Sequence, residues 1–351
     1  FISSISSIMK TNSTHPMVSV VIPHYGGFDI LKECIDSLSS SIYSKLEIIV
    51  VDNNSSDNTI IQLKKKYPQV KLVISKYNRG FAGGCNFGVK NALGEYILIL
   101  NNDTIHEPGW INKLVSFMEK NKSVSSVQPK IKNYFNKQYF DYSGACGGFI
   151  DKYCFPFLRG RLFNTIEKDE GQYDNKCKIF WASGTAFLTR KEIFNEIGGF
   201  DETLFAHMEE IDFHWKCQLL GYEVWVDPSS VIFHRGAATL SKNSPYKTYL
   251  NYRNSLILLL TNYPIHTSLF LFIPRFILEC ISLIKELLVF NWRHAFAIIK
   301  SWFWILINLK KLYKRKVQFQ KKFKSKLDLI YQKSIVKDYF IYKKKFFLNI
   351  D

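Results

Sequence analysis

Residues able to do chemistry gather where apolar runs of the sequence end. The run Tyr96–Leu100 stops at Asn101, Asn102 and Asp103, an abrupt change from bulky apolar side chains to two amides and a carboxylate. An unbroken run of this kind predicts a strand that is buried on both faces of a parallel sheet. Because ligands of open α/β sheets bind beyond the carboxyl ends of the strands, Asp103 is a candidate ligand for a hard cation or a phosphate ester. The alternative is an Asn/Asp turn that leads into the helix near Gly109.

A second group of carboxylates opens a predicted helix much later in the chain. Glu209, Glu210 and Asp212 precede an apolar helical face that extends to Gly221. A carboxylate in this position can act as a general base across a cleft, or it can simply complement the helix dipole. His234 ends a short predicted strand near these carboxylates, and a buried structural histidine is one interpretation of it.

The elements that must position these residues alternate between strand and helix. This alternation indicates an α/β domain with a doubly wound, mostly parallel sheet and a Rossmann-like half that binds a nucleotide. A glycine-rich turn at 78–84 is predicted to lead into one of the helices. Strands are predicted at 17–23, 46–51, 70–74, 96–100, 124–127, 179–188, 223–226 and 230–233, and helices at 28–38, 57–63, 86–92, 191–197 and 211–220.

Composition indicates a folded protein with two unlike parts. The chain has 351 residues, of which 47% are hydrophobic and 22% charged, and this excludes disorder as the main state. Residues 1–240 hold 26 Lys and Arg against 25 Asp and Glu, whereas residues 241–351 hold 21 against 5. The basic excess therefore lies in the C-terminal third, and the acidic partner that it implies would bind there. Seven cysteines without a C-x-x-C pair favour a reducing, cytoplasmic compartment.

The predicted organisation has three parts. Residues 1–16 are a flexible Ser-rich segment, 17–245 are the α/β domain, and 246–351 are a helical, basic region. Residues 134–178 are aromatic-rich without a clear period and predict an insert or a β-ribbon near the acceptor. No charge-free run of about 20 strongly apolar residues is apparent after 246. We therefore expect amphipathic helices, apolar on one face and cationic on the other, that lie on an anionic membrane surface.

Four sites at strand ends or turns converge on one crevice: Asp52, the 78–86 loop, Asp103, and the Glu209/Glu210 pair with His234. Glycines in the loop would let the backbone approach a phosphate closely. The first strand is not followed by G-x-G-x-x-G, so the pattern is not that of a dinucleotide site.

The order of these motifs resembles glycosyltransferase family 2, with the GT-A fold, and in particular its rhamnosyltransferase-like branch. The resemblance covers roughly residues 17–262. It rests on seven short motifs in the family's order: Val18-Ser19-Val20-Val21-Ile22-Pro23, Val50-Val51-Asp52-Asn53-Asn54-Ser55, Asn78-Arg79-Gly80-Phe81, Leu100-Asn101-Asn102-Asp103, Gly198-Gly199-Phe200-Asp201, Glu209-Glu210-Ile211-Asp212 and His234-Arg235-Gly236.

The resemblance implies an inverting transferase that uses a nucleotide-diphosphate sugar and a divalent cation, Mg²⁺ or Mn²⁺. Asp103 and His234 would hold the cation. Glu210 would be the general base, with Glu209 and Asp212 as the other candidates. The nucleotide would be bound by Pro23, Tyr25, Asp52, Asn78, Gly80, Asn86 and Asn102.

Two departures from the family pattern accompany the resemblance. Asn101 and Asn102 stand where the family has the rest of its D-x-D element, and Glu210 stands where Asp is more usual. The leading prediction is a metal-dependent hexosyltransferase for cell-surface polysaccharide synthesis, bound peripherally to the inner face of the membrane. The predicted acceptor is lipid-linked or a glycan, and the family branch suggests rhamnose as the sugar. A catalytically weak sugar-nucleotide-binding scaffold is the alternative. A nucleic-acid-binding protein, suggested only by the basic tail, would leave the acidic cluster unexplained, and we predict no nucleic-acid partner.

Overall fold

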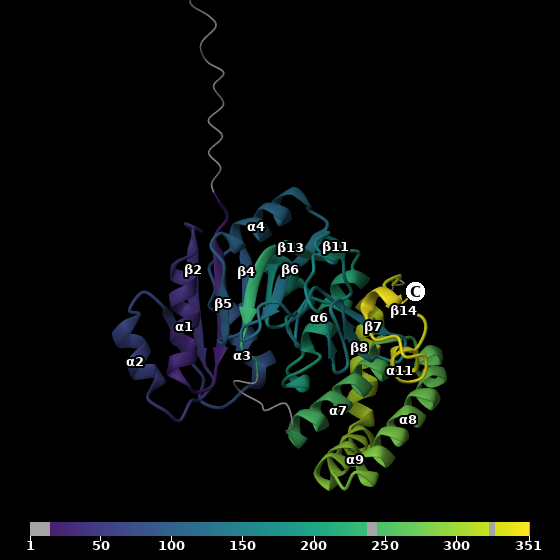
Figure 1. Ribbon diagram of the computed structural model, residues 1–351. Coiled ribbons are helices and arrows are strands. Elements are labelled where there is room, and N and C mark those ends of the chain that lie inside the picture. Colours follow the sequence, from purple (N-terminus) through teal and green to yellow (C-terminus); the bar gives the residue numbers. More distant parts are fainter. Residues whose placement is uncertain (1–14, 237–243, 323–326, 351) are drawn as a thin grey trace, which may run out of the picture.

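A nine-stranded sheet forms the centre of the fold in this computed structural model, which describes residues 15–236, 244–322 and 327–350 (Figure 1). The predicted flexible segment 1–16 lies outside the described residues except for its last two positions. The first half of the sheet is parallel, in the order β3-β2-β1-β4. These strands are β1 (Val18–His24), β2 (Leu46–Asp52), β3 (Lys71–Ile74) and β4 (Tyr96–Leu100).

The second half of the sheet is mixed. It contains β6 (Val124–Asn133), β12 (Ala186–Arg190), β13 (Glu223–His234), β5 (Thr104–His106) and β11 (Cys177–Lys178). β12 pairs antiparallel with both β4 and β6, and β6 pairs parallel with β13. The strand predicted at 179–188 begins only at 186. The two strands predicted at 223–226 and 230–233 form one strand, with a register shift in its middle. The predicted α/β class with a mostly parallel central sheet is confirmed.

Helices cover both faces of the sheet, and apolar strand residues pack against them on each side. The helices in this part of the chain are α1 (Phe28–Ser39), α2 (Thr59–Lys66), α3 (Gly80–Lys90), α4 (Trp110–Lys120), α5 (Lys191–Ile197), the 3₁₀ turn η1 (Glu202–Leu204) and α6 (Glu209–Leu219).

The glycine-rich segment is a helix rather than the turn that we predicted. α3 begins at Gly80, and its glycines lie where the helix crosses the sheet closely. A Cβ atom on Gly88 would stand 2.3 Å from Val21 Cγ1, and one on Gly84 would stand 3.1 Å from Pro23 Cβ. The glycines are therefore needed for close helix–sheet contact, which turn statistics do not reveal.

The region 134–178 forms most of a second, five-stranded sheet in the order β10-β9-β8-β7-β14. Its last strand comes from the C-terminal third of the chain and pairs parallel with β7, so that third is joined to the main domain. The strands are β7 (Gly148–Asp151), β8 (Pro156–Leu158), β9 (Arg161–Leu162), β10 (Thr165–Ile166) and β14 (Ile330–Tyr331).

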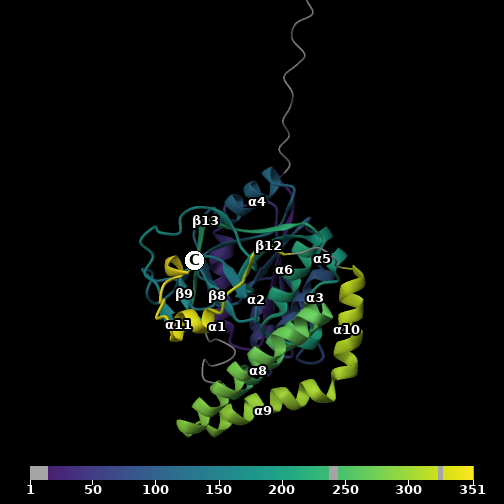
Figure 2. The same cartoon turned by 90° about the vertical axis from the view of Figure 1, so that its right-hand side faces the viewer.

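The helices of the C-terminal third form a layer beside this core (Figures 1 and 2). α8 and α9 lie side by side and pack on α7, and α10 returns along the main domain towards α5. The predicted boundary at 245/246 falls in the first turn of α7. The helices are α7 (Pro245–Asn262), α8 (Ile265–Leu288), α9 (Trp292–Ile307), α10 (Leu309–Lys322), α11 (Ile335–Phe340) and the 3₁₀ turn η2 (Phe347–Asn349).

The charges in the middle of α8 do not lie on an outer face, contrary to our expectation. Arg275 and Glu279 point inward and pair at 2.8 Å, because α7 and α9 supply the partners Ser255 Oγ and Trp302 Nε1. The outward face of α8 is therefore apolar except for the exposed Lys285 near its end. Among the described residues, α8 is the one helix long and apolar enough to cross a membrane by length and composition, which our sequence reading had not anticipated. The exposed cations lie mainly on α10.

Candidate active site

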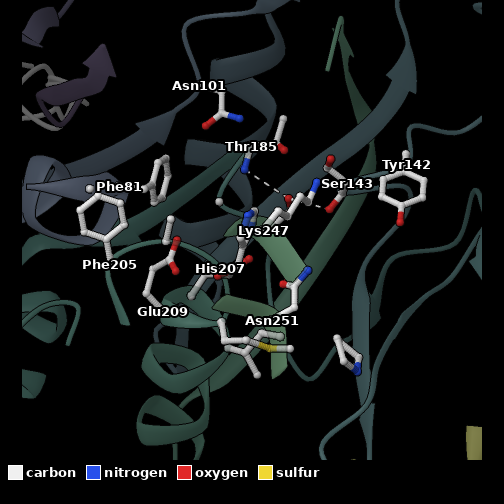
Figure 3. A pocket seen from close by; sticks show the side chains of 18 of the residues that line it. Phe81, Asn101, Tyr142, Ser143, Thr185, Phe205, His207, Glu209, Lys247 and Asn251 are labelled. Atoms are coloured by element: carbon white, nitrogen blue, oxygen red, sulfur yellow. Dashed lines mark hydrogen bonds between the residues drawn. The ribbon is translucent and has the colours of Figure 1, made fainter. Parts of the chain in front are cut away.

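One cavity of about 740 Å³ opens at the carboxyl ends of the central strands. Its lining comes from the strand ends, from the start of α6, from the second sheet and from α7 and α8. Figure 3 shows this convergence: Asn101 and Thr185 lie at the sheet edge, Glu209 and His207 lie across from them, and Lys247 reaches in from α7. Residues from distant parts of the sequence thus meet in one site.

The residues predicted to bind the nucleotide fall into two groups, those that line the cavity and those that do not. Pro23, Tyr25, Asn78, Gly80 and Asn102 all line the cavity.

Asp52 and Asn86, in contrast, are not among the lining residues. Asp52 is buried and accepts a hydrogen bond from Ser55 N at 3.1 Å, which shapes the turn after β2. The Asn86 side chain bonds the backbone of Phe200 in both directions, at 2.9 Å each. The geometry gives both residues a supporting contact to the backbone.

Asn53 lines the cavity and was missed as a site residue. Its amide donates to Gly80 O at 2.8 Å and accepts from Arg79 N at 3.0 Å, so it holds the start of α3 beside the end of β2. The only sequence signal was its place directly after Asp52.

His24 also lines the cavity without having been predicted. Burial lowers the pKa of His24 to about 4, with Asp57 and Asp52 opposing this effect. The imidazole is therefore neutral, and its Nδ1 accepts from the Asn102 amide at 2.7 Å. This pair fixes the Asn102 side chain at the strand end.

Asp103 and His234 are brought together by the pairing of β5 with β13. Asp103 Oδ1 lies 3.1 Å from His234 Nε2, within ion-pair distance, yet it is buried without a hydrogen bond of acceptable geometry. His234 Nδ1 lies 2.9 Å from Asp141 Oδ1. Burial alone would lower the pKa of His234, but the carboxylates of Asp103 and Asp141 raise it to about 10.

Asp103 and His234 offer a carboxylate oxygen and an imidazole nitrogen 3.1 Å apart, which are donor types that a divalent cation accepts. Asp141 would hold the imidazole as a carboxylate typically holds a metal-binding histidine. The described residues contain no cluster of three or more His, Cys, Asp or Glu that could bind a metal unaided. A cation here would need phosphate oxygens or water as further ligands.

Glu209 and Glu210 stand side by side at the N-terminus of α6, and both line the cavity. Burial raises the pKa of Glu210 to about 7, against the opposing effect of the surrounding backbone amides. Burial and the Glu210 charge raise the pKa of Glu209 well above its usual value. A carboxylate with a pKa near 7 can take up and release a proton near neutral pH.

Asp212 does not line the cavity. Its carboxylate lies 2.6 Å from Arg315 on α10 and 2.7 Å from Lys216. Although burial would raise the pKa of Asp212, the charges of these two cations hold it well below the usual range. The geometry thus assigns Asp212 to an ion-pair network that ties α6 to α10, and it separates Asp212 from the other two candidates for the base.

The loop before α6 has a strained backbone that α7 holds in place. Phe205, His207 and Met208 all have positive φ angles, between 64° and 73°, which side-chain-bearing residues adopt at an energetic cost. Asn254 donates to three carbonyl groups of this segment at 2.7–2.9 Å, and Arg253 donates to two at 3.0 Å. These buried polar residues of α7 position the start of α6.

The parallel half of the sheet ends at Asp103, and it faces α6, which begins with Glu209 and Glu210. This arrangement defines a transferase of the GT-A class. Residues 19–198 match the family model described as glycosyl transferase family 2. The chain belongs to this family.

The curated relatives carry the same class of name. An uncharacterized glycosyltransferase of Rickettsia typhi is 36% identical over 205 residues, which cover 56% of this chain and 57% of the relative. The N-acetylglucosaminyl-diphospho-decaprenol L-rhamnosyltransferase of Mycobacterium tuberculosis is 24% identical over 239 residues, which cover 64% of this chain and 78% of that protein. The chain spans between about a third and just over half of the first curated relatives that it matches.

Solved structures agree on the fold. GalNAc-T7 with UDP, GalNAc and Mn²⁺ aligns with a TM-score of 0.57 at 18% identity, over 73% of this chain and 50% of that chain. A mannosyltransferase from Pyrobaculum calidifontis in complex with GDP-Man and Mn²⁺ aligns with a TM-score of 0.51 at 16% identity, over 88% of this chain and 85% of that chain.

Proposed function

We propose that this glycosyltransferase inverts the anomeric centre of a nucleotide-diphosphate sugar and transfers the sugar to a lipid-linked or glycan acceptor in cell-surface glycan synthesis. The observation that carries the proposal is the shared cavity. Asp103 and His234 line one side of it, and Glu210 lines it from the start of α6. An in-line displacement needs a leaving-group site and a base on opposite faces of the reacting carbon.

Glu210 takes the proton of the acceptor hydroxyl in this mechanism. The acceptor oxygen then forms a bond to the anomeric carbon while the bond from that carbon to the diphosphate oxygen breaks, and the nucleoside diphosphate leaves. A carboxylate with a pKa of about 7 is well matched to this task because about half of it is ionised at pH 7 and the ionised form is more basic than an ordinary carboxylate. Burial and the charge of Glu210 raise the pKa of the neighbouring Glu209 as well.

Asp103 and His234 would hold a Mg²⁺ or Mn²⁺ ion, and a bound ion would supply positive charge against the departing diphosphate. Asp141 orients His234 for this role through Nδ1. Asn102, fixed by His24, presents polar atoms beside the same strand end. Pro23, Tyr25, Asn53 and Asn78, which line the cavity near the ends of β1, β2 and β3, would receive the nucleotide.

The acceptor and the sugar are proposals from the relatives. The mycobacterial relative is named for a rhamnosyl transfer to a diphospho-decaprenol acceptor, which supports a lipid-linked acceptor and rhamnose as the first sugar to test. The exposed apolar faces of α8 and α9 and the cations of α10 support a position on the inner face of an anionic membrane.

The test is a thermal-shift panel of nucleoside diphosphates and their sugars, with Mg²⁺, with Mn²⁺ or with chelator. The true donor should raise the melting temperature because it binds only the folded state, and it should do so more with the cation. Transfer is then measured with that donor and a diphosphate-linked lipid acceptor. Absence of a shift with every nucleotide would refute the proposed donor class.

One observation favours the second candidate, a sugar-nucleotide-binding scaffold. Asp103 is the single carboxylate of its strand-end motif, since Asn101 and Asn102 occupy the other positions. A stable shift with a sugar nucleotide, together with no turnover with any acceptor or with water, would support the scaffold instead.

A further inference from the structure

The far end of the cavity has a different character from the nucleotide end. It is formed by the second sheet and by α7 and α8, rather than by the strand ends of the central sheet. The residues that line this end include Phe155, Pro156, Arg161, Phe163, Tyr252 and Arg275.

Arg161 at this end is a cation that forms no ion pair with a described carboxylate. The hydrogen bond described for its Nη1 is a long one, 3.4 Å to Phe163 O, and its Nε is buried with no partner. Burial lowers the pKa of Arg161, while a hydrogen bond with the Tyr142 side chain and the charge of Asp141 oppose this effect.

Two other arginines in the described part of the chain have carboxylate partners. Arg275, which lines the same end, pairs with Glu279 and donates to Tyr153 O and Ser255 Oγ. Arg315 pairs with Asp201 and Asp212. A half-buried cation that lacks such partners in a ligand cavity is suited to an anionic ligand.

The surroundings of Arg161 favour a phosphate group. The guanidinium carbon of Arg161 lies 4.0 Å from the centroid of the Tyr142 ring, so the ring packs against one face of the guanidinium group. The ring of Tyr142 also lies 5.9 Å from Lys247 Nζ, which places a second cation near the same wall. Planar guanidinium groups bind phosphate oxygens in a directed way that a single ammonium cannot match.

An apolar surface lies on the same side of the molecule. α8 contributes Arg275 to the cavity, and its outward face exposes large apolar side chains. Three of them, Phe270, Ile273 and Ile277, are between 54% and 78% exposed. A ligand with a phosphate at the cavity and a hydrocarbon chain beyond it would match both features.

We infer that Arg161 binds a phosphate of the acceptor, so that the acceptor is a sugar joined through phosphate to an apolar lipid. This inference rests on the proposed function and assigns a residue to the acceptor side of that function. Arg161 is a binding residue for the acceptor phosphate and is not among the residues proposed to receive the nucleotide.

The experiment measures binding of geranyl diphosphate, a short soluble probe, to the full chain by calorimetry. The buffer contains chelator, so that a cation at Asp103 cannot hold the probe. The arms are geranyl diphosphate, geraniol and inorganic pyrophosphate. We expect the diphosphate lipid to bind, pyrophosphate to bind more weakly, and geraniol not to bind measurably. Equal binding of geraniol and geranyl diphosphate would overturn the inference without any variant.

The variants test the residue. Arg161→Gln should weaken geranyl diphosphate binding by about 10-fold or more, as expected for losing hydrogen bonds to a charged group, and Arg161→Lys should restore part of it. Arg159→Gln is the matched control, because Arg159 lies two residues away, donates to Asn175 O at 3.2 Å and does not line the cavity. Equal affinities of Arg161→Gln and the wild type, or equal losses in both Gln variants, would overturn the assignment.

Titration of the same variants with the nucleoside diphosphate and Mn²⁺ separates the two hypotheses. Arg161→Gln should keep its nucleotide affinity, and a loss there would place Arg161 at the donor diphosphate and overturn the inference. If no nucleotide binds even the wild type, the proposed function fails, while the geranyl diphosphate arms still decide whether Arg161 binds phosphate.

Discussion

Arg315 Nη2 lies 2.6 Å from Asp212 Oδ1, so the helix that follows the apolar α8–α9 pair is joined to the helix that carries Glu209 and Glu210. Asp201, on the loop before α6, completes the network at 2.7 Å from Arg315 Nε. The basic C-terminal third therefore supports α6, the helix that carries the proposed base, in addition to any role at a membrane.

Arg315→Met should destabilise the protein and lower turnover. Removing one partner of a buried ion pair leaves the others uncompensated, at a cost of roughly 3–5 kcal/mol. Lys314→Met removes the same charge from an exposed neighbour and is the control. Thermal unfolding and transfer rates are compared for both variants, and equal melting temperatures would show that the network contributes nothing to stability.

Asp103→Asn should nearly abolish transfer and leave the fold intact, because the amide keeps the shape of the side chain but lacks the charge that holds a divalent cation. The Mn²⁺-dependent part of the thermal shift with nucleotide should disappear as well. Wild-type activity of this variant in excess chelator would contradict a metal role for Asp103.

Glu210→Gln should bind the donor normally and lose turnover by roughly 100-fold or more, since the shape remains and the basicity is gone. Glu209→Gln should lose less, because Glu210 is the proposed base. Asp212→Asn should act mainly on stability through Arg315. If Glu209→Gln is instead the inactive variant, the base has been assigned to the wrong member of the pair.

The pH profile of kcat/KM should fall on the acid side with an apparent pKa near 7. Glu210 works in its ionised form, so the rate is full above its pKa of about 7 and drops roughly tenfold per pH unit below it. A profile that is flat between pH 5 and 8 would remove Glu210 as the base.

Membrane docking is tested best with substitutions, because a truncation near Tyr263 would also remove Arg315. Exchange of Lys310, Lys311 and Lys314 for Gln should reduce binding to anionic vesicles by roughly 100-fold at low salt, at about 1 kcal/mol per charge, with little effect on neutral vesicles. Phe270→Ser with Ile277→Ser should reduce binding to both, since these exposed side chains supply the apolar contact. Co-sedimentation with vesicles that neither the Lys substitutions nor the Ser substitutions change would contradict membrane docking through α8 and α10.

Local sequence patterns were sufficient for the main elements of the central domain. The apolar run 96–100 and the polar residues after it predict a buried strand with Asp103 at its end, and β4 has those bounds. The order of strands and helices then implies which strand ends share one edge. Asp103, Glu209, Glu210 and His234 could therefore be named together before any contact was known.

Tertiary structure decided the contacts that periodicity cannot express. Asp141 meets His234, and Arg315 meets Asp212, across 93 and 103 residues of chain, respectively. The glycines of α3 were read as a turn because the close approach of Val21 to Gly88 and of Pro23 to Gly84 arises only in the fold. Arg161 stands in a region without a regular pattern, and its place in the cavity wall and its unpartnered Nε become visible only in the folded chain. Sequence determines local conformation and burial through short-range periods, whereas the partner of a buried charge is determined by packing between distant segments.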